Sequence, residues 1–319
     1  MSNKNEMSEE DYLRRHLQDM EEGKKNSESK TQNTDIPFNI SASAAENTKV
    51  SDLQFFNYDV RELPCGQFYP QGTLFMVRPA QVREIQAYSM VDDNNFYDIV
   101  EKMNDMLQSC VRIKYSDGRV GSFLEIKDQD RLFLVFLIRE LTFQQGNSLS
   151  VNKNCDVCSE EHQLELKRQY FNFHEIDEKL VKFYNKANGC YNFKTINGKS
   201  FELTPPNIGL QKAFTDYIIK ENNEKRSPNL SFLKIIPFML PGRTNITYDG
   251  IKAKLKEFED MDDISFQFLN GAVGKMTFGI KELKTTCKCG AEVRTDMQFP
   301  NGASGIFVVH DAFEAYIKE

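Results

Sequence analysis

The chain has 319 residues, which is enough for one large domain or two ordinary ones that bury their own cores. Its formal net charge of −7 disfavours nucleic acid and anionic membranes as partners, because both are usually bound through basic patches. The sequence has no run of apolar residues long enough to span a membrane, and its first residues lack the apolar core of a signal peptide. We therefore expect a cytosolic protein that does not interact with membranes.

Residues 1–50 are polar and poor in aromatic side chains. Such a segment cannot bury enough apolar surface to offset the entropy that is lost on ordering. We predict a disordered tail here, in which residues 8–20 have the pattern of a short helix that is either transient or ordered by a partner.

Residues 51–190 form the first predicted half. A short strand is expected within Gly72–Pro79, because the proline ends the apolar run. The stretch Asp128–Phe143 is so rich in Leu, Phe, Val and Ile that a helix there must be buried nearly all round. This helix is the expected centre of the core.

Another helix is predicted between these two elements. Apolar residues recur at helical spacing from Phe96 to Cys110, and Asp92 and Asp93 precede them as candidate caps. The spacing places Cys110 on the buried face, where a thiol packs as a small apolar group.

The hydrophobic period changes after Cys158. Apolar and polar residues alternate from His162 to Lys167, which indicates a strand that leaves a turn. Cys155 and Cys158 are therefore predicted to lie in the turn of a hairpin.

Residues 191–319 form the second predicted half, which repeats the order of elements in the first half. Gly198–Pro205 resembles Gly72–Pro79, and an apolar stretch at Asp262–Ile280 is followed by a second pair, Cys287 and Cys289. The chain is thus predicted to have an α+β fold of two related halves, in which each half is a strand-helix unit that ends in a Cys-pair hairpin.

The candidate metal ligands are Cys155, Cys158, Cys287 and Cys289. Tetrahedral zinc takes four soft donors, and each close pair offers two thiolates from one turn. Gly290 can adopt the left-handed conformation that such a turn needs. In a reducing compartment, close Cys pairs are better explained as metal ligands than as disulfides. We predict one structural zinc in a zinc-ribbon-like site of four cysteines that joins the two halves.

Other interpretations of these cysteines stay open. His162 or His310 can replace one sulfur ligand, or the four thiols can pack without a metal. In a dithiol oxidoreductase the thiol lies at a helix N-terminus, which lowers its pKa, whereas a strand is predicted after Cys158. Acidic neighbours such as Asp156 and Glu160 are also expected to raise the thiol pKa.

The sequence contains no recognisable catalytic motif. It has no His-Glu-x-x-His, no Gly-rich phosphate loop with Lys-Ser/Thr and no Gly-x-Ser-x-Gly. We expect a protein that is not an enzyme and has no small-molecule substrate. Cys65 and Cys190 lie in glycine-containing loops where they are free to be exposed, and we assign them no role.

A zinc-ribbon nucleic-acid-binding regulator is the alternative function. Basic residues do occur together at Lys167-Arg168 and within Lys252–Lys256, but Glu and Asp residues lie elsewhere on the same stretches. We expect a solvated surface at both places and no nucleic-acid partner.

One segment carries a family resemblance. Leu63-Pro-Cys-Gly-Gln-Phe-Tyr-Pro70, with Gly72–Pro79 close behind, resembles the baseplate hub assembly proteins of T4-like bacteriophages. Members of that family carry a similar Leu-Pro-Ser-x-Gly-x-x-Tyr-Pro opening, and Cys65 stands where Ser is more usual. The resemblance covers roughly residues 60–170 and extends more loosely to the last Cys pair.

The resemblance implies a structural or assembly protein of the phage baseplate hub that acts through protein contacts. Its partners would be other baseplate hub or tail proteins. It would work in the host cytoplasm during assembly, with the tail baseplate of the virion as a second location. The resemblance implies no catalytic residues.

Overall fold

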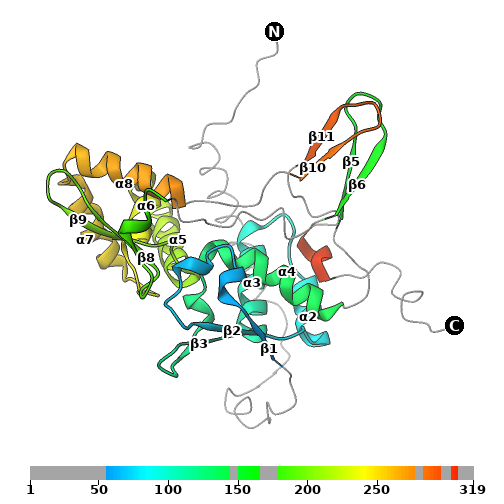
Figure 1. Cartoon of the computed structure of the whole chain (residues 1–319), viewed down its shortest axis with the longest axis horizontal. Helices are drawn as coiled ribbons and strands as arrows, with labels where there is room; N and C mark the ends of the chain where they lie inside the picture. Colours follow the sequence, from blue (N-terminus) through cyan, green and yellow to red (C-terminus); the bar gives the residue numbers. More distant parts are fainter. Residues whose placement is uncertain (1–54, 144–149, 166–177, 277–282, 296–302, 308–319) are drawn as a thin grey trace.

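A computed structural model describes residues 55–143, 150–165, 178–276, 283–295 and 303–307 (Figure 1). Helices and small antiparallel sheets are mixed along the chain, which confirms the predicted α+β class. The predicted tail, residues 1–50, lies outside the described residues. Among the described helices, none has the length and apolar character needed to cross a membrane.

A four-stranded antiparallel sheet organises the first half. In spatial order its strands are β1 (Phe56–Tyr58), β2 (Leu74–Val77), β3 (Val111–Lys114) and β4 (Val120–Gly121). Phe75 and Val77 of β2 are buried and pair with Ile113 and Val111 of β3. The strand predicted within Gly72–Pro79 is confirmed and occupies an inner position of the sheet.

Helices pack beside this sheet (Figure 1). They are α2 (Val82–Ser89), α3 (Phe96–Cys110) and α4 (Arg131–Thr142). Cys110 is fully buried, as predicted. The predicted caps Asp92 and Asp93 are wrong, because α3 begins later: Asn95 Oδ1 accepts a hydrogen bond from the Asp98 N–H at 3.2 Å. Asp92 instead closes the turn before the helix.

The second half contains a three-stranded sheet and four helices among its described residues (Figure 1). The strands are β7 (Tyr184–Asn185), β8 (Cys190–Lys194) and β9 (Ser200–Leu203), and the helices are α5 (Ile208–Asn223), α6 (Leu230–Ile235), α7 (Tyr248–Glu259) and α8 (Asp263–Met276). Because β8 begins at Cys190 and pairs with β7, the predicted boundary between residues 190 and 191 lies inside this sheet.

Short 3₁₀ helices connect the larger elements. They are η3 (Val60–Glu62), η4 (Gly66–Phe68), η5 (Phe123–Glu125), η6 (Asp128–Asp130), η8 (Val181–Phe183), η9 (Ile236–Met239) and η10 (Ala303–Phe307). The helix predicted over Asp128–Phe143 is therefore divided into η6 and α4.

Gly198 and its predicted counterpart Gly72 both have a left-handed φ and precede a strand, β9 or β2. The hydrogen bonding of the Gly198 turn matches that of the turn at Gly118. Gly198 and Gly118 both follow a turn residue, Asn197 or Asp117, and both have φ of +85°. In each turn the glycine N–H donates to the carbonyl three residues earlier. This likeness reflects the same hairpin chemistry, and a relation between the whole halves stays a prediction.

Two further hairpins lie beside each other and apart from the larger sheets (Figure 1). They are β5 (Ser150–Asn154) with β6 (Glu161–Glu165), and β10 (Leu283–Thr286) with β11 (Glu292–Thr295). β6 lies next to β10, and β5 lies next to β11. The predicted hairpins at both Cys pairs are confirmed.

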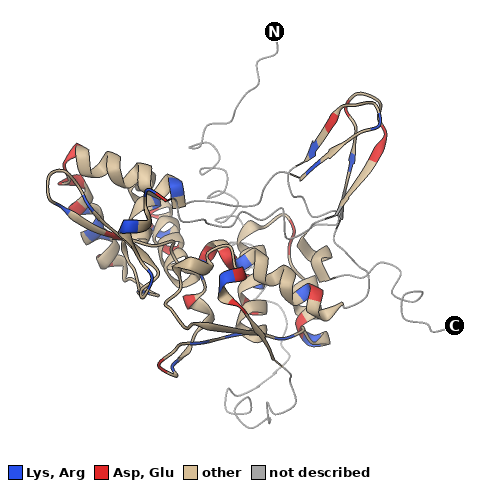
Figure 2. Ribbon diagram, in the orientation of Figure 1, with Lys and Arg blue, Asp and Glu red and all other residues tan. Residues whose placement is uncertain are grey.

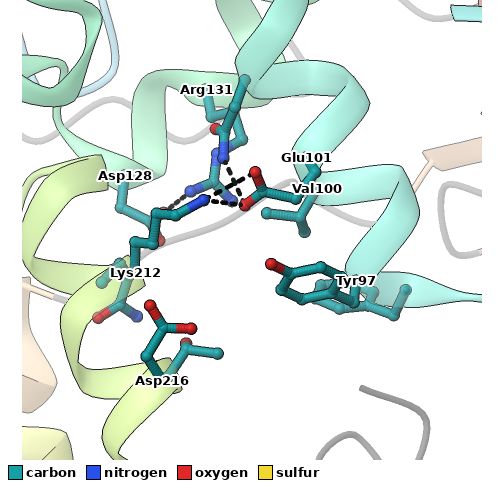
Figure 3. A pocket seen from close by; sticks show the side chains of 11 residues that line it. Tyr97, Val100, Glu101, Asp128, Arg131, Lys212 and Asp216 are labelled. Carbon is teal, nitrogen blue, oxygen red and sulfur yellow. Dashed lines mark hydrogen bonds and ion pairs between the residues drawn. The ribbon is translucent and has the colours of Figure 1, made fainter. Parts of the chain in front are cut away.

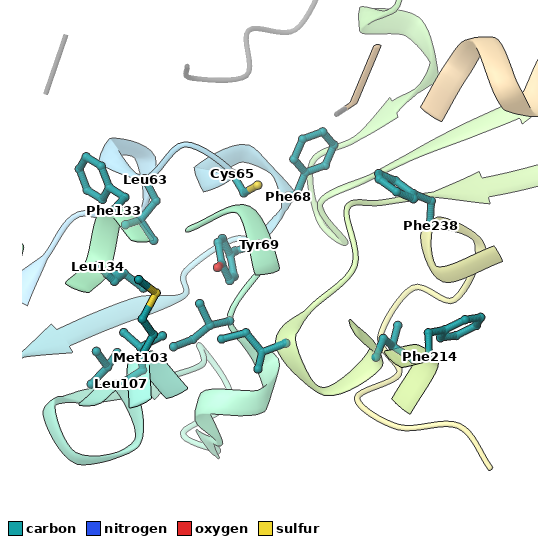
Figure 4. Packing of buried hydrophobic residues seen from close by; sticks show 14 of the residues in the cluster. Leu63, Cys65, Phe68, Tyr69, Met103, Leu107, Phe133, Leu134, Phe214 and Phe238 are labelled. Atoms are coloured by element: carbon teal, nitrogen blue, oxygen red, sulfur yellow. The ribbon is translucent and has the colours of Figure 1, made fainter. Parts of the chain in front are cut away.

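The segment Leu63–Pro70 lies between the two halves. Leu63, Cys65 and Tyr69 pack into the first half, and Phe68 lies towards the second half, which contributes Phe214 and Phe238 (Figure 4). One cluster of buried apolar side chains includes residues from both halves. Cys65 is fully buried, which contradicts the expectation of an exposed thiol.

Cys190 is also fully buried, so the same expectation is wrong for it. Its neighbour Gly189 approaches the backbone of Phe68 so closely that a Cβ there would lie 2.5 Å from the Phe68 carbonyl carbon. The Gln71 N–H donates to the Ala187 carbonyl at 3.3 Å, and the Tyr184 hydroxyl donates to the Gln67 carbonyl. The β7–β8 turn is therefore seated on the segment Leu63–Pro70.

Two buried ionisable residues, Asp130 and Lys127, add to the contact between the halves. Asp130 accepts hydrogen bonds from the Cys65 N–H and the Tyr69 hydroxyl, both at 2.7 Å. The Lys127 Nζ donates to Thr204 Oγ1 at 3.0 Å and to a second-half backbone carbonyl at 2.9 Å. Burial raises the pKa of Asp130 to about 7 and lowers the pKa of Lys127 to about 8.

The last described element, η10, packs against helices of the first half. Arg139 Nε of α4 donates to the Ile306 carbonyl at 2.6 Å. The ring centroids of Tyr88 and Phe307 are 5.0 Å apart in an edge-to-face contact. Because η10 follows the second hairpin in the sequence, the chain crosses between the halves more than once.

Replacing Gly189 with Ala tests the close backbone approach. We expect the free energy of unfolding to fall by about 2–4 kcal/mol, because the new methyl group overlaps Phe68 and the residue keeps a left-handed φ. Gly198→Ala is the matched control: it has a left-handed φ and open space around its Cβ, so it should lose only about 1 kcal/mol. Urea unfolding of both variants gives the comparison, and equal losses would contradict the close approach.

The raised pKa of Asp130 predicts a pH dependence of stability. The fold favours the protonated carboxyl, so this stabilisation is complete below the ordinary pKa of 3.8 and is lost as the pH rises to about 7. Relative to Asp130→Asn, the wild-type free energy of unfolding should therefore decrease across this range. Denaturant unfolding of both proteins at several pH values measures the difference, and parallel pH profiles would show that Asp130 titrates normally.

Candidate metal centre

The two Cys pairs lie in turns of similar construction. Cys155 directly follows β5 and Cys287 directly follows β10. The Ser159 N–H donates to the Cys155 carbonyl, and the Gly290 N–H donates to the Cys287 carbonyl, both at 2.9 Å. A left-handed residue closes each turn, with φ of +60° at Ser159 and +84° at Gly290. The left-handed conformation predicted for Gly290 is confirmed.

The fold brings the four sulfur atoms together. Cys155 Sγ lies 3.7 Å from Cys289 Sγ, and Cys158 Sγ lies 3.4 Å from Cys287 Sγ. All four sulfur atoms lie within 4.8 Å of one another. Tetrahedral zinc with bonds of about 2.3 Å would place its sulfur ligands about 3.8 Å apart. The four cysteines predicted as ligands therefore form a cluster that can bind a metal ion.

Backbone N–H groups point at the sulfur of Cys155. The N–H groups of Cys158 and Val157 donate to it, and they lower its pKa to about 7. The expectation that acidic neighbours raise the pKa is wrong for this thiol, because the N–H groups of its own turn dominate. They favour the thiolate, which is the form that binds metal.

At Cys287 the groups that raise the thiol pKa outweigh the one that lowers it. The Cys289 N–H lowers its pKa, but burial, the Cys158 and Cys289 thiols and the Glu160 carboxylate together raise the pKa well above its usual range. Cys155 and Cys287 are buried, whereas Cys158 and Cys289 are exposed. The cluster thus has two inner and two outer sulfur atoms, so a metal ion or a chelator can reach it from solvent.

Glu160 and His162 border the cluster. Cys287 Sγ donates to Glu160 Oε2 at 3.3 Å, and Lys288 Nζ pairs with Glu160 Oε1 at 2.7 Å. A His162 nitrogen, a Glu160 oxygen and the Cys287 sulfur also lie within 4.8 Å of one another. His162 is thus a neighbour of the four-sulfur group, and His310 lies outside the described residues. The sequence did not predict the contact between Glu160 and Cys287. Glu160 lies close to Cys158 in the sequence, which suggested only repulsion between a carboxylate and a thiolate.

Comparisons of the chain with protein-family models, with curated proteins and with solved structures found no match.

Removing two thiols should abolish metal binding. We expect one metal ion per chain in native mass spectrometry and none in the double variant Cys155→Ser/Cys287→Ser, because two remaining sulfurs cannot close a tetrahedral shell. Cys110→Ser is the control, since this thiol lies in the core of the first half and should not affect metal content. A metal-free wild-type chain, purified without chelators, would contradict the metal centre.

Proposed function

We propose that this chain is a structural or assembly protein in which one zinc ion joins two distant hairpins. The observation that carries this proposal is the meeting of four thiols from β5–β6 and β10–β11 in one cluster. Thiolates suit zinc better than magnesium or calcium, which prefer oxygen ligands. Four sulfur ligands complete the shell of zinc and leave no position for a substrate, so the role that we propose for the metal is structural and not catalytic.

The binding partners that we propose are other baseplate hub or tail proteins of a T4-like phage, during assembly in the host cytoplasm. The resemblance of Leu63–Pro70 to the hub assembly family supports this context. The segment is buried, and the β7–β8 turn packs on it. A chain that contains this segment therefore also contains the contact between the two halves.

The charges on the two metal-site hairpins favour a protein partner over nucleic acid. The β5–β6 hairpin is mainly acidic and the β10–β11 hairpin is mainly basic, and the basic side chains on both lie close to acidic ones (Figure 2). Lys153 pairs with Asp156, and Lys288 pairs with Glu160. Lys284 and Arg294 both pair with Glu292. A zinc ribbon that binds nucleic acid needs basic side chains that are available to phosphates.

Binding assays separate the two functions. At about 150 mM salt the chain should form a complex with purified hub proteins of the same phage in size-exclusion chromatography, and it should not bind DNA or RNA in fluorescence anisotropy. The double variant Cys155→Ser/Cys287→Ser should bind the hub proteins less tightly, because the hairpins lose their common orientation. Affinity for nucleic acid that falls steeply with salt, together with no hub complex, would favour the regulator instead.

A further inference from the structure

Glu160, His162 and Cys287 form a second group of metal ligands beside the four-sulfur cluster. One nitrogen of His162, one oxygen of Glu160 and the Cys287 sulfur all lie within 4.8 Å of one another. Glu160 directly precedes β6, His162 lies on β6, and Cys287 directly follows β10. The group therefore joins the same two hairpins as the four cysteines, and Cys287 belongs to both groups.

The contact between Glu160 and Cys287 has nearly the dimensions of a metal site. Glu160 Oε2 lies 3.3 Å from Cys287 Sγ. A tetrahedral zinc ion with its oxygen ligand at about 2.1 Å and its sulfur ligand at about 2.3 Å holds these two atoms about 3.6 Å apart. The two side chains therefore need to separate only slightly to bind an ion between them.

Metal binding at the four cysteines changes the charge that Glu160 faces. When it is protonated, the Cys287 thiol donates its hydrogen to Glu160 Oε2. A thiolate that binds zinc has no hydrogen to donate, so the same contact then brings two anionic groups together. Four thiolates around one Zn²⁺ also leave about two negative charges on the cluster. A second cation between Cys287 and Glu160 would offset this repulsion.

Lys288 supplies only part of that positive charge. Its Nζ pairs with Glu160 Oε1 at 2.7 Å, whereas the Cys287 sulfur faces Glu160 Oε2. The Lys288 side chain is 88% exposed, and an ion pair at so exposed a position contributes little. Glu160 can therefore offer Oε2 to a metal ion while Oε1 keeps its contact with Lys288.

His162 supplies the nitrogen ligand of the group. Its Nε2 is buried and has no hydrogen-bond partner among the described residues. A buried polar atom without a partner is costly, and neutral imidazole is the commonest metal ligand among protein side chains. One nitrogen, one oxygen and one sulfur suit zinc and similar divalent ions, whereas magnesium and calcium prefer oxygen alone.

We propose that Glu160, His162 and Cys287 bind a second divalent ion of the zinc class, with the Cys287 sulfur as a bridge between the two ions. The bridge rests on the proposed function, because it requires a metal ion at the four cysteines. Three protein ligands leave the fourth position of a tetrahedral shell to water or to a ligand from a binding partner. Because this shell is incomplete and shares a sulfur, it binds its ion more weakly than the four cysteines do.

Zinc titration of the full-length chain, followed by native mass spectrometry, tests the proposal. We expect one ion per chain at equimolar zinc and two at about a tenfold excess, with an apparent dissociation constant about 100-fold higher for the second ion. The double variant Glu160→Gln/His162→Gln should keep the first ion and lose the second. Glu161→Gln is the matched control, because this exposed neighbour on β6 lies outside the group and should still bind two ions.

¹¹³Cd NMR gives a readout that an ion on the surface would not reproduce. Sulfur ligands move the ¹¹³Cd resonance downfield, so cadmium at the four cysteines and cadmium at the mixed group give separate signals. In the wild type we expect the two nuclei to be coupled through the shared Cys287 sulfur. Glu160→Gln should lose the upfield signal, and its retained downfield signal would show that the four-sulfur cluster is still assembled.

Several outcomes would overturn the proposal. A second zinc ion that persists in Glu160→Gln/His162→Gln would be an adventitious ion only, and two uncoupled cadmium signals would exclude the bridge. A wild-type chain that binds one ion and never a second would contradict the second site alone. A chain that binds no ion at equimolar zinc would contradict the four-sulfur centre and the bridge together, so the two failures are distinguishable.

Discussion

The contact between the halves depends on two buried ionisable residues that lie three positions apart. Asp130 holds the segment Leu63–Pro70 through Cys65 and Tyr69, and Lys127 reaches Thr204 in the second half. Each ionisable group has been removed from water, so each needs the hydrogen bonds that the other parts of the chain supply. These hydrogen bonds fix the positions of η6, the segment Leu63–Pro70 and the end of β9 relative to one another. The surrounding apolar side chains pack around the three segments.

Several contacts join the halves, and three of them differ in kind. The buried network lies at the centre, the Glu101–Lys212 ion pair joins α3 to α5 (Figure 3), and the four-sulfur cluster joins the outer hairpins. They differ in strength, because a partly exposed ion pair contributes little, whereas a thiolate–metal shell binds tightly. A metal ion in the cluster would therefore set how firmly the hairpins are held, whereas the buried network sets how the two main sheets meet.

Sequence reasoning succeeded where a residue pattern acts locally. Helical spacing predicted α3 with Cys110 inside, and the alternation after Cys158 predicted a strand, because periodicity and turn chemistry operate over a few residues. The Cys pairs were also recognisable, since metal ligands need fixed short spacings. The burial of Cys65 and Cys190 could not be predicted, because both lie in loops that are covered only by distant segments. Lys127 looked like an ordinary polar residue before the predicted helix and Asp130 like one in its first turn, because the segments that bury them are distant in the sequence.

The distance in sequence between the two Cys pairs has a consequence for biosynthesis. When Cys155 and Cys158 leave the ribosome, the pair that completes their shell, Cys287 and Cys289, has not yet been made. Two sulfurs bind zinc far more weakly than four, so a nascent chain could not hold the proposed ion firmly until Cys287 and Cys289 have been translated. Metal loading would therefore wait for the second hairpin, and products that end before it would lack half of the ligands.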